Sequence, residues 1–183
     1  AYLRPGESEL TVKQLIPPVA GSRLAGHHWA ILLNPTEELK PGKTNLFDET
    51  VVLDSDPWMH SVLLALRCNR QPDESLWRHS YLEYKEMFAA SLLALNISFL
   101  GLCLYSLRHG GASTDLLGRR RPVDEVKKRG RWASDSSVKR YGKEARLQSE
   151  TSRVPPPILA FGSRVLQHLP QLLSGALMPL SPP

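Results

Sequence analysis

The pattern of apolar and polar positions predicts strands in the first third of the chain and helices in the rest. Apolar runs at 27–35 and 50–55 have the length of strands, and the second is rich in β-branched residues. Pro41 and Gly42 lie between these runs where a turn is expected, so the two strands should form an antiparallel hairpin. The earlier segment 7–15 has helical spacing and is ended by two prolines.

The remainder of the chain has the apolar spacing of helices separated by Gly and Pro. We expect helices at 58–70, 80–96, 122–130 and 135–148. A third apolar segment is punctuated by Gly110 and Gly111, and ASTDLL at 112–117 is expected to continue it as a helix. The predicted fold class is therefore α+β, mainly α-helical with a small antiparallel β-sheet. The VPPP sequence at 154–157 ends the pattern, so we expect one domain over residues 1–150. The Pro- and Leu-rich tail over 151–183 is expected to be either a docking helix or disordered.

Composition limits the class of protein. The chain has 183 residues, of which 42% are hydrophobic and 22% charged, as in ordinary globular domains with a buried core. An Arg, a His and a Pro interrupt the apolar stretch at 158–180, which argues against a membrane span. The sequence begins with neither a signal-peptide core nor a Met, so we expect an intracellular fragment of a longer protein. Cys68 and Cys103 lack metal-ligand spacing and are expected to be buried, reduced thiols.

Positive charge is concentrated in one part of the chain. The net charge is +5, with 23 Lys and Arg against 18 Asp and Glu. Residues 108–146 alone hold twelve Lys or Arg and five Asp or Glu, a net +7. A basic surface of this kind favours a polyanionic partner, although a solvated helix face has the same composition.

Five residues of chemical interest occur in short motifs spread over the chain. They are Arg4 in YLRPGE, Lys43 in KTNLFDETVVL, Arg108 in YSLRH, Trp132 in GRW and Tyr141 in VKRY. In this order, and with Tyr141 nine residues after Trp132, the motifs resemble the catalytic domain of the tyrosine recombinases. These are phage-integrase-like enzymes that break and rejoin DNA. The resemblance covers residues 1–148 and is greatest to divergent members carried by eukaryotic mobile elements.

The resemblance implies both a fold and a function. The fold would be that of the DNA breaking-rejoining enzymes, with part of the domain preceding this fragment. The function would be site-specific DNA recombination or integration through a 3′-phosphotyrosyl intermediate. The resemblance further implies double-stranded DNA as partner, a homotetramer on two duplexes, a nuclear location in a eukaryote, and no metal or cofactor.

Elementary chemistry supports the implied roles of the cationic residues and the tryptophan. Cleavage of a phosphodiester without a metal requires fixed cations that stabilise charge on the nonbridging oxygens. The guanidinium groups of Arg4 and Arg108 suit this because they stay charged and bind phosphate oxygens in bidentate geometry. Trp132 would donate its indole N–H to a nonbridging oxygen, since indole can only donate.

The remaining roles concern bond formation and proton transfer. Tyr141 would attack phosphorus and form the covalent intermediate. Lys43, at the mouth of the hairpin, would protonate the leaving 5′-oxygen, and Lys40 is the alternative acid. Tyr105 stands where the family most often has His; it can donate to phosphate but, with an ordinary pKa of about 10, is a poor proton shuttle at neutral pH. His109, directly after Arg108, is expected to point elsewhere on its helix.

Two other functions fit the same residues. A truncated or decayed module would bind DNA without cutting it, which is consistent with Tyr105 at the usual His position. A type IB topoisomerase-like enzyme would share the chemistry and relax supercoiled DNA without site preference.

Overall fold

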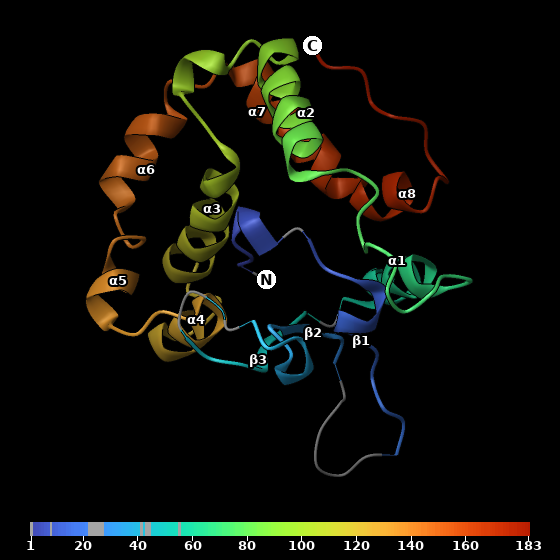
Figure 1. The fold of residues 1–183 in the computed structure, drawn as a ribbon. Helices are drawn as coiled ribbons and strands as arrows, with labels where there is room; N and C mark the ends of the chain where they lie inside the picture. The colour runs from blue at the N-terminus through green and yellow to red at the C-terminus, as the bar shows by residue number, and fades with distance from the viewer. Residues whose placement is uncertain (1, 8, 22–27, 41, 43–44, 55) are drawn as a thin grey trace. The chain divides into compact units, whose positions relative to one another are not determined.

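The computed structural model describes residues 2–7, 9–21, 28–40, 42, 45–54 and 56–183. These residues form two compact units, which we treat separately (Figure 1). The sheet unit is Gly6–Ser80, and the helical unit is Tyr2–Pro5 together with Tyr81–Pro183. The chain divides into these units near residue 80, and the tail helices belong to the helical unit. A single domain over 1–150 stays a prediction.

The sheet unit contains a three-stranded antiparallel sheet in the order β1-β2-β3. Its strands are β1 (Leu15–Ile16), β2 (Ala30–Leu33) and β3 (Glu49–Val52). Ile31 on the central strand lies opposite Val51 on β3, and both side chains are buried. The hairpin expected from the apolar runs is confirmed, because one face of each strand is apolar and covers the core.

The helix expected at 7–15 is wrong. The structure has a 3-10 turn that ends at Glu7 and another at Val12–Gln14, which is followed directly by β1. The backbone of this segment pairs with a distant part of the chain: Leu76 donates its N–H to the carbonyl of Leu10 over 2.6 Å, and both side chains are buried. These non-local hydrogen bonds replace the local ones that a helix would make.

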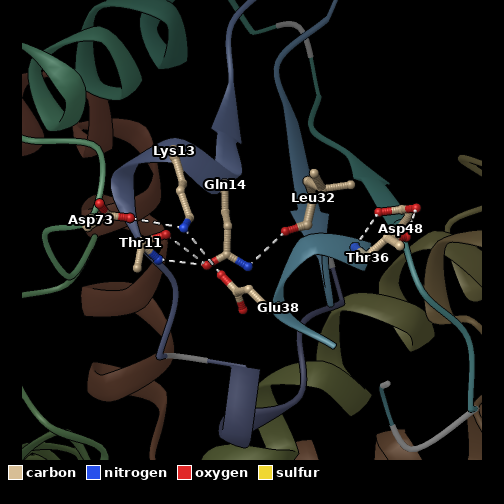
Figure 2. Close-up of polar contacts among 8 residues, drawn as sticks. All are labelled: Thr11, Lys13, Gln14, Leu32, Thr36, Glu38, Asp48 and Asp73. Atoms are coloured by element: carbon tan, nitrogen blue, oxygen red, sulfur yellow. Dashed lines mark hydrogen bonds and ion pairs between the residues drawn. The ribbon is translucent and has the colours of Figure 1, made fainter. Parts of the chain in front are cut away.

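A buried amide connects this turn to the sheet (Figure 2). Gln14 is only 6% exposed, and its Oε1 accepts the backbone N–H of Thr11 over 2.8 Å. Its Nε2 donates to the Leu32 carbonyl on β2 over 3.1 Å. Beside it, Lys13 donates to Asp73 over 2.9 Å. The buried polar group is therefore paired on both sides, as burial requires.

Helix α1 (Pro57–Arg67) completes the sheet unit, with proline at its first position as the sequence indicates. The buried Trp29 donates its indole N–H to Nδ1 of His60 on this helix over 3.0 Å. Arg67, in the last turn, donates to the Leu15 carbonyl of β1. Helix and sheet are thus joined by side-chain hydrogen bonds at both ends of α1.

The helical unit contains seven α-helices among its described residues. They are α2 (Tyr81–Ala94), α3 (Leu104–Leu117), α4 (Val123–Gly130), α5 (Asp135–Lys139), α6 (Glu144–Thr151), α7 (Pro156–Gln167) and α8 (Leu169–Leu173). Helices α2 and α4 confirm the helices expected at 80–96 and 122–130, and α3 confirms the helix expected to include 112–117. The tail is helical over α7 and α8 and has no helix over 174–183, and its expected docking on a neighbouring protomer stays a prediction. A small core joins the N-terminal segment to α3, α4 and α5 through Tyr2, Ala112, Val126, Val138 and Tyr141.

Two further expectations need correction. The helix expected over 135–148 is broken, because α5 ends at Lys139 and α6 begins at Glu144. Tyr141 therefore lies in the turn between them, with its N–H donating to the Val138 carbonyl over 2.9 Å. Both cysteines are exposed rather than buried. Cys103 is exposed because it occupies the N-cap of α3, where its N–H bonds to the Ser106 hydroxyl over 3.1 Å.

Candidate functional site

Helix α3 carries three side chains of the candidate site within one turn. Leu104 and Ala112 on its inner face are buried, and Arg108 shares that face because it lies four residues from each. Tyr105 and His109 lie on the neighbouring face and are exposed to solvent; Tyr105 is 41% exposed. The helix thus places an inward cation next to two outward polar rings.

Arg108 is almost fully buried, with 3% of its surface exposed. One terminal nitrogen donates to the backbone carbonyl of Tyr2 and the other to that of Gly130. Its guanidinium carbon also lies 4.9 Å from the centroid of the Trp132 ring. The guanidinium is therefore held in one place by two segments outside α3 and lies against an aromatic ring.

Trp132 follows α4 and covers this guanidinium. Arg131 ends the helix in the left-handed conformation, with φ of 52°, and turns the chain so that Trp132 folds back over α4. Gly130 is required here, because a methyl group added at its α-carbon would overlap the six-membered ring of Trp132. The indole ring lies 4.6 Å from the Tyr141 ring and 6.0 Å from the Tyr2 ring, centroid to centroid.

Tyr141 is 6% exposed and lies among these aromatic and cationic groups. Burial raises the pKa of its phenol above the ordinary value, the neighbouring Tyr105 adds to the rise, and the charge of Arg108 opposes it. The hydroxyl is therefore protonated at neutral pH. An attack by this oxygen requires a group that removes its proton.

The expectation that His109 points elsewhere is wrong. Its ring makes edge contacts with both Tyr105 and Tyr141, each with 4.8 Å between centroids. The contact with Tyr105 follows from their spacing of four residues on one helix face. The contact with Tyr141 arises because the turn after α5 lies against α3, which no local pattern indicates.

Tyr2 is a site neighbour that the sequence reasoning missed. It is 3% exposed, its ring stacks on Trp132, and its hydroxyl donates to Asp115 on α3. Burial and the hydrogen bond to the Asp115 carboxylate raise the pKa of Tyr2. Arg121 donates to the same carboxylate over 2.9 Å. An aromatic residue two positions before Arg4 was the only local signal of this anchor.

The structure brings together four of the six predicted site residues: Tyr105, Arg108, Trp132 and Tyr141. Arg4 is half-buried on the segment Tyr2–Pro5, which belongs to the same unit. Lys43 lies outside the described residues. The alternative acid, Lys40, is exposed and lies in the sheet unit.

Exposed cations flank the turn that holds Tyr141. Lys139, Arg140 and Lys143 are all exposed within two residues of it. Elsewhere on this basic segment, Lys127 pairs with Asp135 over 2.7 Å. The region around the phenol is thus positively charged at its surface.

Other features lie outside this cluster. A pocket of about 520 Å³ between α6 and α7 is lined by mainly apolar residues from Leu147 to Leu159, and none of the predicted site residues lines it. Among the residues that the structure describes, no group of three or more His, Cys, Asp or Glu is arranged to hold a metal ion. Within the same residues, no helix combines the length and apolar character needed to cross a membrane.

No model of a known protein family matches this sequence, and neither the curated proteins nor the solved structures contain a match to it.

Proposed function

We propose that this chain is a tyrosine recombinase-like DNA strand transferase, which cleaves and rejoins DNA through a 3′-phosphotyrosyl bond at Tyr141. The observation that carries the proposal is the convergence of Arg108, Trp132 and Tyr141 from three separate segments. Arg108 lies 4.9 Å from the Trp132 ring, and that ring lies 4.6 Å from Tyr141. Packing between helices does not by itself require a buried arginine at this position, because arginine is rarely fully buried.

Arg108 contributes through its fixed charge. Its positive charge lowers the pKa of the Tyr141 phenol, in opposition to burial. The same charge stabilises negative charge that develops at the attacking oxygen and the phosphate. Because the guanidinium is held by two backbone carbonyls, it needs little reorganisation during the reaction.

DNA would bind along the basic surface beside the phenol. Lys139, Arg140 and Lys143 can neutralise phosphates on either side of Tyr141. Tyr105, which is 41% exposed, can donate its hydroxyl to the phosphate under attack. Arg4 would be the second cation, and Lys43 or Lys40 would protonate the leaving 5′-oxygen. Assembly as a tetramer on two duplexes belongs to the same proposal.

The test is covalent capture of DNA. The 183-residue chain is incubated with a pool of nicked duplexes of randomised sequence, so that the short cleaved strand diffuses away, and adducts are resolved on a denaturing gel. We expect an adduct with the unaltered chain and none with Tyr141→Phe. Tyr84→Phe, an exposed tyrosine on α2, is the matched control and should form the adduct normally. Adduct formation by Tyr141→Phe would refute the role of Tyr141.

A second candidate is a module that binds DNA without cleaving it. It is favoured by the burial of Tyr141, at 6% exposure, and by the use of Arg108 donors for backbone carbonyls. This function predicts binding to the same duplexes that weakens steeply with salt, and no adduct at any salt concentration.

A further inference from the structure

His109 is the neighbour of Tyr141 that neither the motif pattern nor the proposed roles above use. Its imidazole contacts two phenols, those of Tyr105 and Tyr141, with 4.8 Å between ring centroids in each case. The side chain is exposed, so its ring has room to turn about its own torsions.

The chemistry of the side chains around Tyr141 distinguishes His109 from the others. Arg108 and Trp132 carry only donors and cannot accept a proton. Tyr105 ends in a phenol, the same group as Tyr141, so it offers no stronger base than the nucleophile itself. Of the described residues in ring contact with Tyr141, His109 is the one with a nitrogen lone pair at neutral pH.

We propose that His109 is the general base that removes the phenolic proton of Tyr141 during strand cleavage. The inference rests on the proposed function. As the Tyr141 oxygen forms its bond to phosphorus, its proton moves to a nitrogen of His109. The bond from phosphorus to the 5′-oxygen breaks, and that oxygen keeps the electron pair and takes a proton from the lysine acid or from water. Religation reverses each transfer.

The ionisation of the neighbouring groups agrees with this direction of transfer. Partial burial, and then the charge of Arg108, lower the pKa of His109, which keeps the imidazole neutral and able to accept a proton. The titratable or charged groups that face it are Tyr105 and Arg108 on α3 and Tyr141 after α5. Cleavage should therefore be slow below the His109 pKa and rise to a plateau above it.

The variants separate proton transfer from packing. His109→Phe keeps an aromatic ring against both tyrosines but has no lone pair, and His109→Gln is a second variant of polar character. We expect both to slow adduct formation roughly 100-fold and to lose the rise in rate with pH, since general bases contribute on this order. His79→Phe, another exposed histidine, is the control and should match the unaltered chain.

A second substrate separates the base from the acid. The pool of nicked duplexes is prepared again with sulfur in place of the 5′-bridging oxygen, so that the leaving group needs no proton. The His109 variants should stay slow with this pool. If the His109 variants form adduct at the normal rate with the sulfur-containing pool, His109 acts as the acid and the inference is overturned. If His109→Phe forms adduct at the normal rate with the oxygen-containing pool, His109 contributes only packing and the inference is likewise overturned. If the unaltered chain forms no adduct with either pool, both the proposed function and the inference are overturned.

Discussion

Replacement of Arg108 by alanine tests whether this residue holds the helical unit together. The guanidinium donates to the carbonyls of Tyr2 and Gly130, both in buried residues, and stacks on Trp132. These contacts connect three segments: the N-terminal one, the end of α4 and the loop after it. In Arg108→Ala the two carbonyls lose their partner while they remain shielded from water.

The magnitude follows from these contacts. A buried group left without its hydrogen-bond partner costs about 1–3 kcal/mol, and there are two carbonyls. A desolvated cation–π contact contributes about 2 kcal/mol. The contributions share one side chain and do not add fully, so we expect a loss of about 4 kcal/mol. That is a large fraction of the ~5–15 kcal/mol that stabilises an ordinary domain.

Hydrogen exchange measures this loss within the helical unit alone. The amides of Val126 and Val138, whose side chains are fully buried, should exchange roughly 1,000-fold faster in Arg108→Ala. Arg153→Ala is the matched control, because Arg153 also donates to a carbonyl and lies over an aromatic ring, that of Phe99. Its side chain is 47% exposed, so its loss should cost less than about 1 kcal/mol. Equal effects of the two substitutions would refute the reasoning.

Three further substitutions test local features. Gln14→Glu should leave the free energy of unfolding nearly unchanged at pH 4 and lower it by about 3 kcal/mol at pH 7, because an ionised carboxylate cannot donate to the Leu32 carbonyl. Urea unfolding at both pH values measures this, and equal stability at the two would contradict it. Leu39→Gly should stabilise the sheet unit by about 1 kcal/mol, because Leu39 is in the left-handed region with φ of 52°, which glycine adopts without strain, and its side chain is 80% exposed. The thermal midpoint should rise, and a lower midpoint would contradict this. Gly130→Ala should displace the Trp132 ring and change its fluorescence, whereas an unchanged spectrum would mean that the ring is not packed there.

The fold was predictable where the apolar spacing of a segment and its hydrogen-bond partners both lie in neighbouring parts of the sequence. The pairing of β2 with β3 follows from two apolar runs that are consecutive along the chain and separated by residues 34–48. Helix α4 follows from Pro122 before it and Gly130 at its end. The segment 7–15 has helical spacing, yet its backbone bonds to residues near Leu76. Spacing alone cannot indicate such a partner, because the pairing depends on the fold of the intervening chain.

The sequence singled out residues that the structure brings together, but it did not indicate the contacts among them. The motifs identified Arg108, Trp132 and Tyr141 without any knowledge of distances. The edge contact of His109 with Tyr105 was open to prediction from their spacing of four residues. The position of Tyr2 was not, because its ring is held by Trp132 and Asp115 from elements more than a hundred residues away.

The break between α5 and α6 decides how Tyr141 can act. Within a continuous helix the ring would have neighbours from its own helix face. In the turn, its ring instead contacts the rings of Trp132 and His109, with 4.6 and 4.8 Å between centroids. The ionisation of its phenol is therefore governed by residues of other segments: burial and Tyr105 raise its pKa, and Arg108 lowers it. Under the proposed function, Tyr141 would therefore depend on neighbours from other segments for its reactivity, and His109 is one of those in ring contact with it.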